Sequence, residues 1–222
     1  MFPRKRLTIL CGHYGSGKTN VAVNIAAELR KSCDTVTVAD LDIVNPYFRT
    51  KDSQDFFAEQ GIRLICSPYA NSNVDIPALP QEMYAITDDR SMTAVLDIGG
   101  DDRGALVLGR LAPKIIAEDD YEMLMVINCY RPLTRDAAST LEVMREIEYA
   151  GGIRFTGLVN NSNLGAATTP EDILASQGYA EEVSRLSGLP LVMTSVRQDL
   201  YPDVEGKVPH AFPLGLQKNK YL

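Results

Sequence analysis

Residues 7–19 read Leu-Thr-Ile-Leu-Cys-Gly-His-Tyr-Gly-Ser-Gly-Lys-Thr and decide the fold of the chain. The stretch opens with an apolar, β-prone run, continues through a glycine-rich loop and ends where a helical pattern begins. Gly12, Gly17, Lys18 and Thr19 fill every fixed position of the phosphate-binding pattern G-x-x-x-x-G-K-[ST]. Because strand, loop and helix follow in the order that this pattern requires, the stretch predicts a phosphate-binding loop rather than an ordinary glycine turn.

Each part of this loop has its own chemical reason. Glycines let backbone N–H groups turn onto phosphate oxygens, since no Cβ blocks a close approach. The helix that opens at Lys18 directs the positive end of its dipole at the same anion. Lys18 would bring a mobile cation to the β and γ phosphates, and the Thr19 hydroxyl is a natural Mg²⁺ ligand. The residues expected to bind nucleotide here are Gly12, His13, Tyr14, Gly15, Ser16, Gly17, Lys18, Thr19 and Asn20.

The composition indicates one sizeable domain. A chain of 222 residues with 45% hydrophobic residues suits a single α/β domain spanning residues 1–222. The net charge of −7 argues against broad binding to nucleic acid or anionic lipid, and the early basic cluster Arg4-Lys5-Arg6 is expected only to flank the first strand. No signal peptide precedes that strand, and no apolar run reaches the ~18 residues of a membrane span. We therefore expect a cytoplasmic protein with no nucleic-acid partner and no membrane anchor.

The four cysteines give no sign of a metal site. Cys11, Cys33, Cys66 and Cys129 are scattered, without a C-x-x-C or C-x-C pair. Three of them lie in or beside expected strands or helix ends, where a cysteine behaves as a small buried hydrophobe. The pattern predicts free thiols in a reducing compartment.

Acidic residues follow two expected strands. Residues 35–39 form a short β-branched strand that leads into Asp40 and Asp42, and an apolar strand from Thr93 ends at Asp97. In doubly wound sheets ligands bind beyond the carboxyl ends of the strands, so these carboxylates are candidates for holding Mg²⁺ or for orienting an attacking water. For Asp40 and Asp42 the alternative is a solvated acidic turn closed by Asn45-Pro46, which stays open. Gly99-Gly100, just after Asp97, is expected to act as a switch segment near a γ-phosphate.

The remaining chain alternates between strand and helix patterns with short connections. This alternation predicts a mostly parallel, doubly wound sheet with helices on both faces, that is, a three-layer α/β/α architecture of the P-loop type. Residues 48–91, broken by several prolines, are expected to form an irregular excursion on the rim of the sheet. Residues 203–222, with two prolines and no amphipathic repeat, are expected to form a tail.

The base of the nucleotide is predicted from two asparagines. The guanine-reading pattern N-K-x-D is absent, and Asn160-Asn161 closes an expected strand where a base could lie. An asparagine amide offers a donor and an acceptor to adenine, so ATP is favoured. The alternative is that one of the pair occupies a positive-φ turn.

Several motifs, taken in order, resemble the MinD/ParA/CobQ-like P-loop ATPases of the SIMIBI class. They extend from residue 7 to about residue 161 and comprise Gly12–Thr19, Asn24-Ile-Ala26, Asp40-Leu-Asp42-x-x-x-Pro46 and Asp97-Ile-Gly-Gly. The resemblance implies an ATP·Mg²⁺ site and, in many members, a nucleotide-dependent homodimer. By matching position it implies Lys18 and Asp42 as catalytic, Asp42 orienting the attacking water, with Thr19, Asp40 and Asp97 at the metal. It also implies Asn160 or Asn161 as the reader of adenine.

One position departs from this pattern. The typical loop of the class is G-K-G-G-x-G-K-[ST], whose first lysine reaches the partner subunit, whereas here His13 takes that position and Tyr14 replaces a glycine. Histidine has an ordinary pKa of about 6.5, although a nearby phosphate would favour its charged form. Activation by a partner subunit is therefore in question for this chain.

Three functions remain from the sequence. The first is a slow ATPase switch that engages a protein partner through the rim. The second is an ATP-dependent ligase or kinase resembling dethiobiotin synthetase or the cobyrinate amidases, with a small carboxylate substrate. The third is a nucleotide-binding scaffold with little hydrolysis, which the histidine at position 13 favours.

Overall fold

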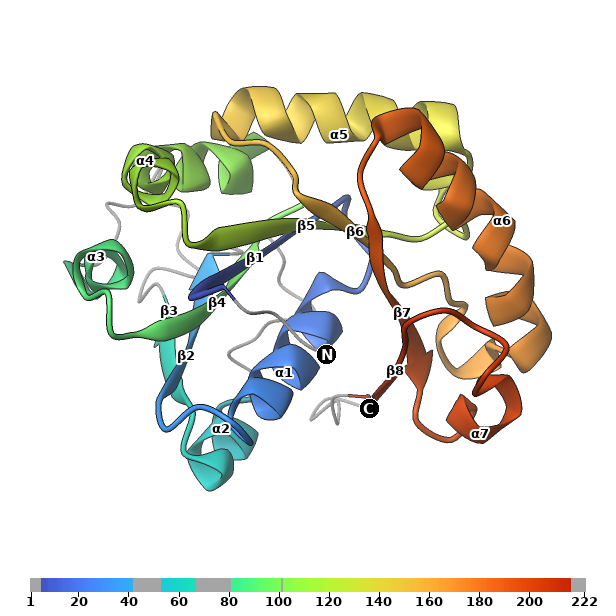
Figure 1. Ribbon diagram of the computed structural model, residues 1–222, viewed down its shortest axis with the longest axis horizontal. Helices are drawn as coiled ribbons and strands as arrows, with labels where there is room; N and C mark the ends of the chain where they lie inside the picture. The colour runs from blue at the N-terminus through green and yellow to red at the C-terminus, as the bar shows by residue number, and fades with distance from the viewer. Residues whose placement is uncertain (1–4, 42–52, 67–80, 101, 217–222) are drawn as a thin grey trace.

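The computed structural model describes residues 5–41, 53–66, 81–100 and 102–216, and over these residues the chain forms a single parallel sheet (Figure 1). Its strand order is β3-β2-β4-β1-β5-β6-β7-β8, and every neighbouring pair is parallel. The strands are β1 (Leu7–Cys11), β2 (Val36–Leu41), β3 (Arg63–Cys66), β4 (Thr93–Ile98), β5 (Tyr121–Ile127), β6 (Gly157–Asn160), β7 (Leu191–Arg197) and β8 (Ala211–Leu214).

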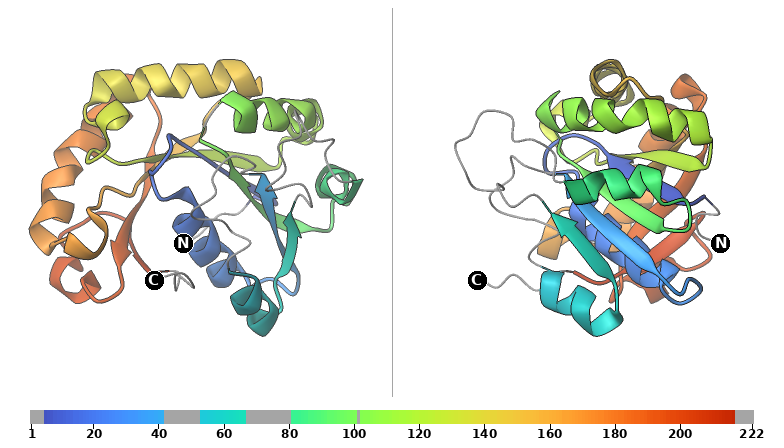
Figure 2. Two further views of the ribbon diagram at one scale, coloured as in Figure 1. Left: turned by 180° about the vertical axis from the view of Figure 1, so that it is seen from behind. Right: turned by 90° about the vertical axis from the view of Figure 1, so that its left-hand side faces the viewer.

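Helices cover both faces of this sheet. They are α1 (Lys18–Leu29), α2 (Gln54–Gln60), α3 (Gln81–Asp88), α4 (Asp102–Glu118), α5 (Ala137–Gly151), α6 (Pro170–Ser187) and α7 (Tyr201–Val204), with short 3₁₀ turns η2 (Pro132–Thr134) and η3 (Gly165–Ala167). The side view in Figure 2 shows three layers, with α4 and α5 on one side of the strands and α1 and α2 on the other. The three-layer α/β/α fold predicted from the sequence is therefore confirmed.

Alternation along the strands divides the core between the two faces. On β1, Leu7 and Ile9 pack with residues of α3 to α6, whereas Leu10 packs with α1 and α2. Helix α1 buries the predicted stripe of Val21 and Ile25 on that second face. Because β1 lies between β4 and β5, the loop that follows it opens at the centre of the sheet's carboxyl edge.

Two segments expected to be irregular contribute to the sheet. Within residues 48–91, the described parts form α2, β3 and α3, and β3 pairs with β2; the remaining residues lie outside the described ranges. Within residues 203–222, β8 adds a strand beside β7. The sequence pattern missed β8 because it is only four residues long and contains Pro213, which is tolerated at a sheet edge.

Helix starts follow ordinary capping chemistry. The predicted start at Thr169-Pro170 is confirmed, since Thr169 accepts from the N–H of Asp172 and the Asp172 carboxylate accepts from the N–H of Thr169. The helix expected to open at Thr134 begins instead at Ala137, with Asp136 capping the N–H of Ser139 at 2.9 Å. The residues before it form the turn η2.

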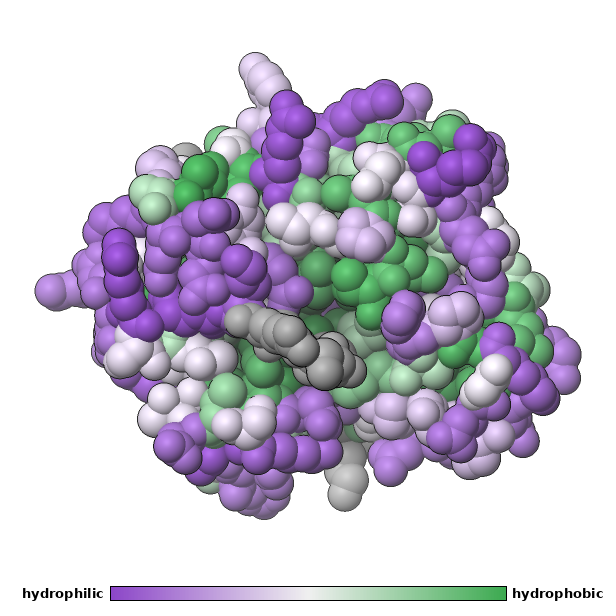
Figure 3. Space-filling view, in the orientation of Figure 1, coloured by the Kyte–Doolittle hydropathy of each residue, from purple (hydrophilic) through white to green (hydrophobic). Residues whose placement is uncertain are grey.

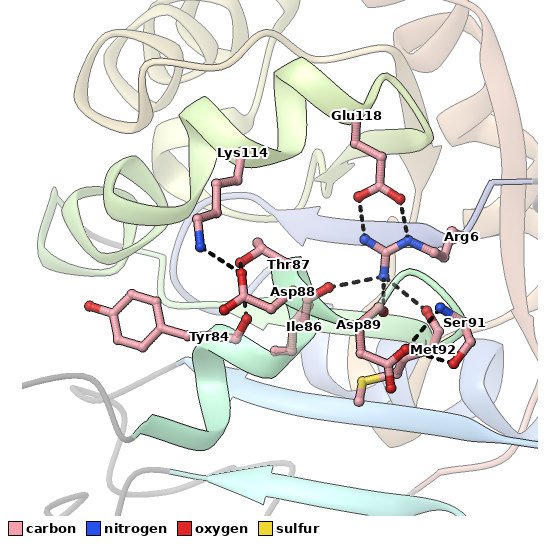
Figure 4. Close-up of polar contacts among 10 residues, drawn as sticks. All are labelled: Arg6, Tyr84, Ile86, Thr87, Asp88, Asp89, Ser91, Met92, Lys114 and Glu118. Carbon is pink, nitrogen blue, oxygen red and sulfur yellow. Dashed lines mark hydrogen bonds and ion pairs between the residues drawn. The ribbon is translucent and has the colours of Figure 1, made fainter.

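The predicted flank of the first strand carries a buried charge. Arg6 is only 8% exposed, and its guanidinium forms a two-pronged ion pair with the Glu118 carboxylate at the end of α4 (Figure 4). Its Nη1 also donates to the carbonyl oxygens of Ile86, Asp89 and Met92. One side chain thus ties β1 to α4 and to the connection between α3 and β4.

The cysteines and the helices agree with two further expectations within the described residues. Cys11, Cys33, Cys66 and Cys129 are all free, but only Cys11 is fully buried, and burial raises the pKa of its thiol far above the ordinary range. No helix in these ranges has both the length and the apolar character needed to cross a membrane.

Candidate functional site

The loop between β1 and α1 is built around glycines in the left-handed region. Gly12, Gly15 and Gly17 have φ values of 152°, 77° and 88°. The N–H of Ser16 donates to the carbonyl oxygen of His13 at 3.1 Å and closes a turn. Gly17 is the N-cap of α1, whose first turn has no side-chain cap and no acidic residue. A concave run of backbone amides next to an uncapped helix start is a binding site for an anion.

Lys18 points its charge into this loop. The residue is only 5% exposed, and its Nζ donates to the carbonyl oxygen of His13 at 3.3 Å. Among the described residues, no carboxylate lies within ion-pair distance of that ammonium group. Lysine is seldom buried without an anionic partner, so the loop carries a positive charge suited to a phosphate.

The predicted metal residues come together beside the loop. The Thr19 hydroxyl donates to Asp97 Oδ2 at 2.8 Å, and both residues are buried. Asp40 on β2 is paired in register with Asp97 on β4, so the two carboxylates extend from neighbouring positions on one face. Asp42 lies outside the described ranges.

These oxygen donors fit Mg²⁺. A hydroxyl that donates its proton to Asp97 keeps its lone pairs for a cation, and carboxylate and hydroxyl oxygens are the hard ligands that Mg²⁺ prefers. No group of three His, Cys, Asp or Glu side chains suited to a metal occurs in the described residues. That result suits a Mg²⁺ site completed by substrate phosphates and water rather than an all-protein cage.

The expected switch segment lies directly against the loop. A Cβ built on Gly100 would lie 2.7 Å from the backbone N of Tyr14, 2.9 Å from the carbonyl oxygen of Gly12 and 2.9 Å from Lys18 Nζ. Only glycine permits this approach. A Cβ on Gly104, in the first turn of α4, would lie 2.6 Å from the backbone of Gly99. The segment therefore links the phosphate-binding loop to the start of α4.

We predict that Gly100→Ala disturbs the loop. The added methyl group meets backbone atoms that cannot yield, so either the loop or the segment after β4 must move. The free energy of unfolding is expected to fall by about 1–3 kcal/mol. Urea denaturation measures this loss, and Gly178→Ala, at a position with open space around it, is the matched control. Equal stability of Gly100→Ala and Gly178→Ala would contradict the contact.

The two asparagines at the end of β6 have different environments. Asn161 Nδ2 donates to the carbonyl oxygen of Ser16 at 2.6 Å, and its Oδ1 accepts from Ser195. Asn160 Nδ2 instead donates to Ser176 Oγ on α6 at 2.9 Å. Neither has a positive φ, which removes the alternative of a left-handed turn. Asn161 therefore supports the phosphate-binding loop directly, and base reading by either residue stays a prediction.

The other predicted loop residues form the surface of the site. His13 is partly exposed, with its Nδ1 3.0 Å from the carbonyl oxygen of Tyr14, and Tyr14 is 55% exposed. The carbonyl oxygen of Asn20, one turn into α1, accepts from Asn24 Nδ2 at 2.8 Å. His13 and Tyr14 are accessible to a ligand or a partner at the rim of the loop.

The sequence analysis missed one side chain that contacts the loop. Arg131 follows the carboxyl end of β5, and its Nε donates to the carbonyl oxygen of Gly15 at 2.8 Å. No motif marks this residue. The available signal was topological, because β5 pairs with β1 and the loops that follow neighbouring parallel strands meet at one edge.

A separate groove lies on the same face of the sheet as α1. It has a volume of about 1010 Å³ and is lined by residues of α1, β5, β7 and β8, including Ala27, Leu124, Met193 and Phe212. Figure 3 shows apolar residues gathered in this part of the surface. Its lining includes none of the predicted site residues.

Comparisons with known proteins bear on the fold. Neither family profiles nor curated protein sequences match the chain. Solved structures that it resembles include the cell division protein FtsY of Thermotoga maritima (TM-score 0.58, 17% identity, covering 87% of this chain and 62% of that one). Others are chloroplast FtsY of Physcomitrella patens (TM-score 0.57, 16% identity, 87% and 59%) and the signal recognition particle receptor FtsY of Elizabethkingia anophelis in complex with GDP (0.52, 14%, 88% and 58%).

This likeness has a defined reach. The chain spans about three fifths of the length of these FtsY proteins, and at such identities the likeness is one of fold. It supports the P-loop fold that the MinD/ParA/CobQ-like resemblance implies. The ATPase family itself remains a prediction from the motifs.

Proposed function

We propose that this protein binds ATP with Mg²⁺ in the loop of residues 12–19 and hydrolyses it slowly, as a nucleotide-controlled switch for a protein partner. The observation that carries the proposal is the buried ammonium group of Lys18, held in a ring of backbone amides beside the Thr19–Asp97 pair. Bound Mg²⁺ would neutralise charge on the β and γ phosphates. Thr19, Asp97 and Asp40 are the residues that would hold it, directly or through water.

Adenine is favoured over guanine by the acceptors available near the base. Guanine presents N–H donors that proteins read with a carboxylate, and residues 160–169 contain no acidic side chain. An asparagine such as Asn161 can satisfy the donor and acceptor of adenine only if its amide exchanges a present partner for the base. Since one FtsY structure contains GDP, GTP is the nucleotide to test beside ATP.

A switch role is supported by the contact of Gly100 with the loop. A γ-phosphate entering near Lys18 must meet this segment, either by hydrogen bonding to its backbone or by displacing it. Any such movement reaches α4, because the first turn of α4 packs on Gly99. Nucleotide state would thereby change a surface that a partner, including a second copy of the chain, can read.

The proposal is tested by titrating the purified protein with ATP, ADP and GTP in the presence of Mg²⁺. Calorimetry gives the affinities, phosphate release gives the turnover, and mass in solution with and without nucleotide reports dimer formation. Tighter binding of ATP than GTP with slow phosphate release is expected. Absence of nucleotide binding would overturn the proposal, and preference for GTP would overturn its adenine part. Turnover that requires a small carboxylate would indicate the ligase or kinase alternative instead.

We predict that Asp42→Ala binds ATP normally but releases phosphate about 100-fold more slowly or less. The expectation follows from the position implied for Asp42 by the motif, where a carboxylate orients the attacking water. Steady-state phosphate release and calorimetry on the same preparation measure the two quantities. Asp34→Ala, which removes an exposed acid before the other end of β2, is the control. Turnover in Asp42→Ala equal to that of the control would reject this role.

A further inference from the structure

Arg131 brings a guanidinium group into direct contact with the phosphate-binding loop. Its Nε donates to the carbonyl oxygen of Gly15 at 2.8 Å, across 116 positions of sequence. Gly15 adopts a left-handed conformation, with φ of 77°, and a Cβ there would lie 3.4 Å from Arg131 Nε. The absence of a side chain at Gly15 therefore lets the guanidinium lie close against the loop backbone.

The segment that carries Arg131 is fixed by the buried Asn128 at the end of β5. Asn128 Oδ1 accepts from the N–H of Tyr130 at 3.0 Å, and its carbonyl oxygen accepts from the Thr134 hydroxyl at 2.8 Å. The N–H of Arg131 itself donates to the same carbonyl oxygen at 3.2 Å. Arg131 is in extended conformation before Pro132, as the residue preceding a proline should be. Its backbone is thus ordered before any ligand arrives, which lowers the cost of binding.

The terminal nitrogens of Arg131 remain available. Nη1 and Nη2 make no hydrogen bond or ion pair with the residues that the structure describes. A guanidinium is always charged and presents paired N–H groups that match the oxygens of a phosphate. The magnesium complex of a nucleoside di- or triphosphate still carries net negative charge, and Lys18 supplies a single positive charge to the loop. A second cation at the loop therefore has an electrostatic role to fill.

We propose that Arg131 binds a phosphate oxygen of the nucleotide held by residues 12–19 and acts as a second fixed cation beside Lys18. The inference rests on the proposed function, since it requires a polyphosphate in the loop. The ligand class is a nucleoside di- or triphosphate, and a nucleoside without phosphate has nothing for Arg131 to bind. Arg131 would also keep its Nε hydrogen bond to Gly15, so that loop and cation hold the anion together.

The test compares wild type, Arg131→Ala, Arg131→Lys and Arg135→Ala. Arg135 is the matched control because it is close in sequence, exposed and paired only with Asp136 in the described residues. Affinities for ATP, ADP and adenosine are measured with Mg²⁺ by displacement of a fluorescent ATP analogue. Arg131→Ala is expected to weaken ATP and ADP roughly 10- to 100-fold, as for a lost hydrogen bond to a charged group, and to leave adenosine unchanged. Arg131→Lys should recover part of the loss, and Arg135→Ala should stay within about twofold of wild type.

A second readout separates a phosphate contact from a structural effect on the loop. The ³¹P spectrum of bound ATP should show one phosphate resonance displaced in Arg131→Ala relative to wild type and Arg135→Ala, while the melting temperature of the free protein stays the same. Wild type that binds no nucleotide would overturn the proposed function and this inference together. Wild type that binds ATP while Arg131→Ala binds it equally well would overturn the role of Arg131 alone. Equal weakening of ATP, ADP and adenosine would show that Arg131 only orders the loop and would also overturn the inference.

Discussion

Lys18→Ala is expected to abolish the rise in melting temperature that ATP and Mg²⁺ produce in the wild-type protein. The substitution removes the ammonium group that the loop buries and leaves the amides to hold the phosphates unaided. A ligand present at 100 times its dissociation constant stabilises the folded state by about 2.7 kcal/mol. For a chain of this size that stabilisation is a shift of roughly 5–11 °C. The shift should fall close to zero in Lys18→Ala.

The control for this experiment lies just beyond the other end of the same helix. Lys31 is exposed and pairs with Glu28, so Lys31→Ala removes the same charge far from the loop. Its ATP-induced shift should equal that of wild type. The free energy of unfolding of Lys18→Ala without nucleotide should not fall, because Lys18 has no carboxylate partner among the described residues to leave unpaired. An unchanged ATP-induced shift in Lys18→Ala would place the nucleotide elsewhere.

The parts of this molecule that follow from local chemistry could be predicted from the sequence. The loop was identifiable because glycine, lysine and threonine each have a separate physical function at a fixed spacing. Asp40 and Asp97 were identifiable because the carboxyl ends of parallel strands share one edge, and the structure pairs them in register. Strand and helix alternation fixed the three layers in the same way.

The parts that depend on long-range contacts could not. Nothing in the local sequence distinguishes Arg131, which reaches Gly15, from the exposed Arg135 four positions later. The two asparagines at 160 and 161 look alike in sequence, yet one supports the loop and the other bonds to α6. Likewise Arg6 looks like a solvated flank of β1 until α4 brings Glu118 against it. In each case the role is set by a partner from a distant element.

The largest stability effect is expected from that last contact. Arg6→Met removes the guanidinium and leaves the Glu118 carboxylate, buried beside it, without its cation, together with the carbonyl oxygens of Ile86 and Met92 (Figure 4). Breaking a buried ion pair from one side costs about 3–5 kcal/mol, which lowers the melting temperature by roughly 6–20 °C here. Calorimetry or urea denaturation measures the loss. Lys114→Met breaks an exposed pair with Asp88 and should lower the melting temperature by less than about 4 °C.

The pH dependence of this loss identifies its cause. The hydrogen bonds from Arg6 hold the pKa of Glu118 below its ordinary value of about 4.3, against the opposing effect of burial. A lowered folded-state pKa stabilises the protein above that ordinary value, and the stabilisation disappears as the pH falls through the folded-state pKa. The gap between wild type and Arg6→Met should therefore be widest near neutral pH and narrow below about pH 4, where a protonated Glu118 needs no cation. Arg6→Met combined with Glu118→Leu should recover most of the loss at neutral pH, since an apolar pair replaces the ionic one. A gap that is independent of pH and unaffected by the second substitution would mean that Arg6 acts through its packing and its carbonyl contacts rather than through the ion pair.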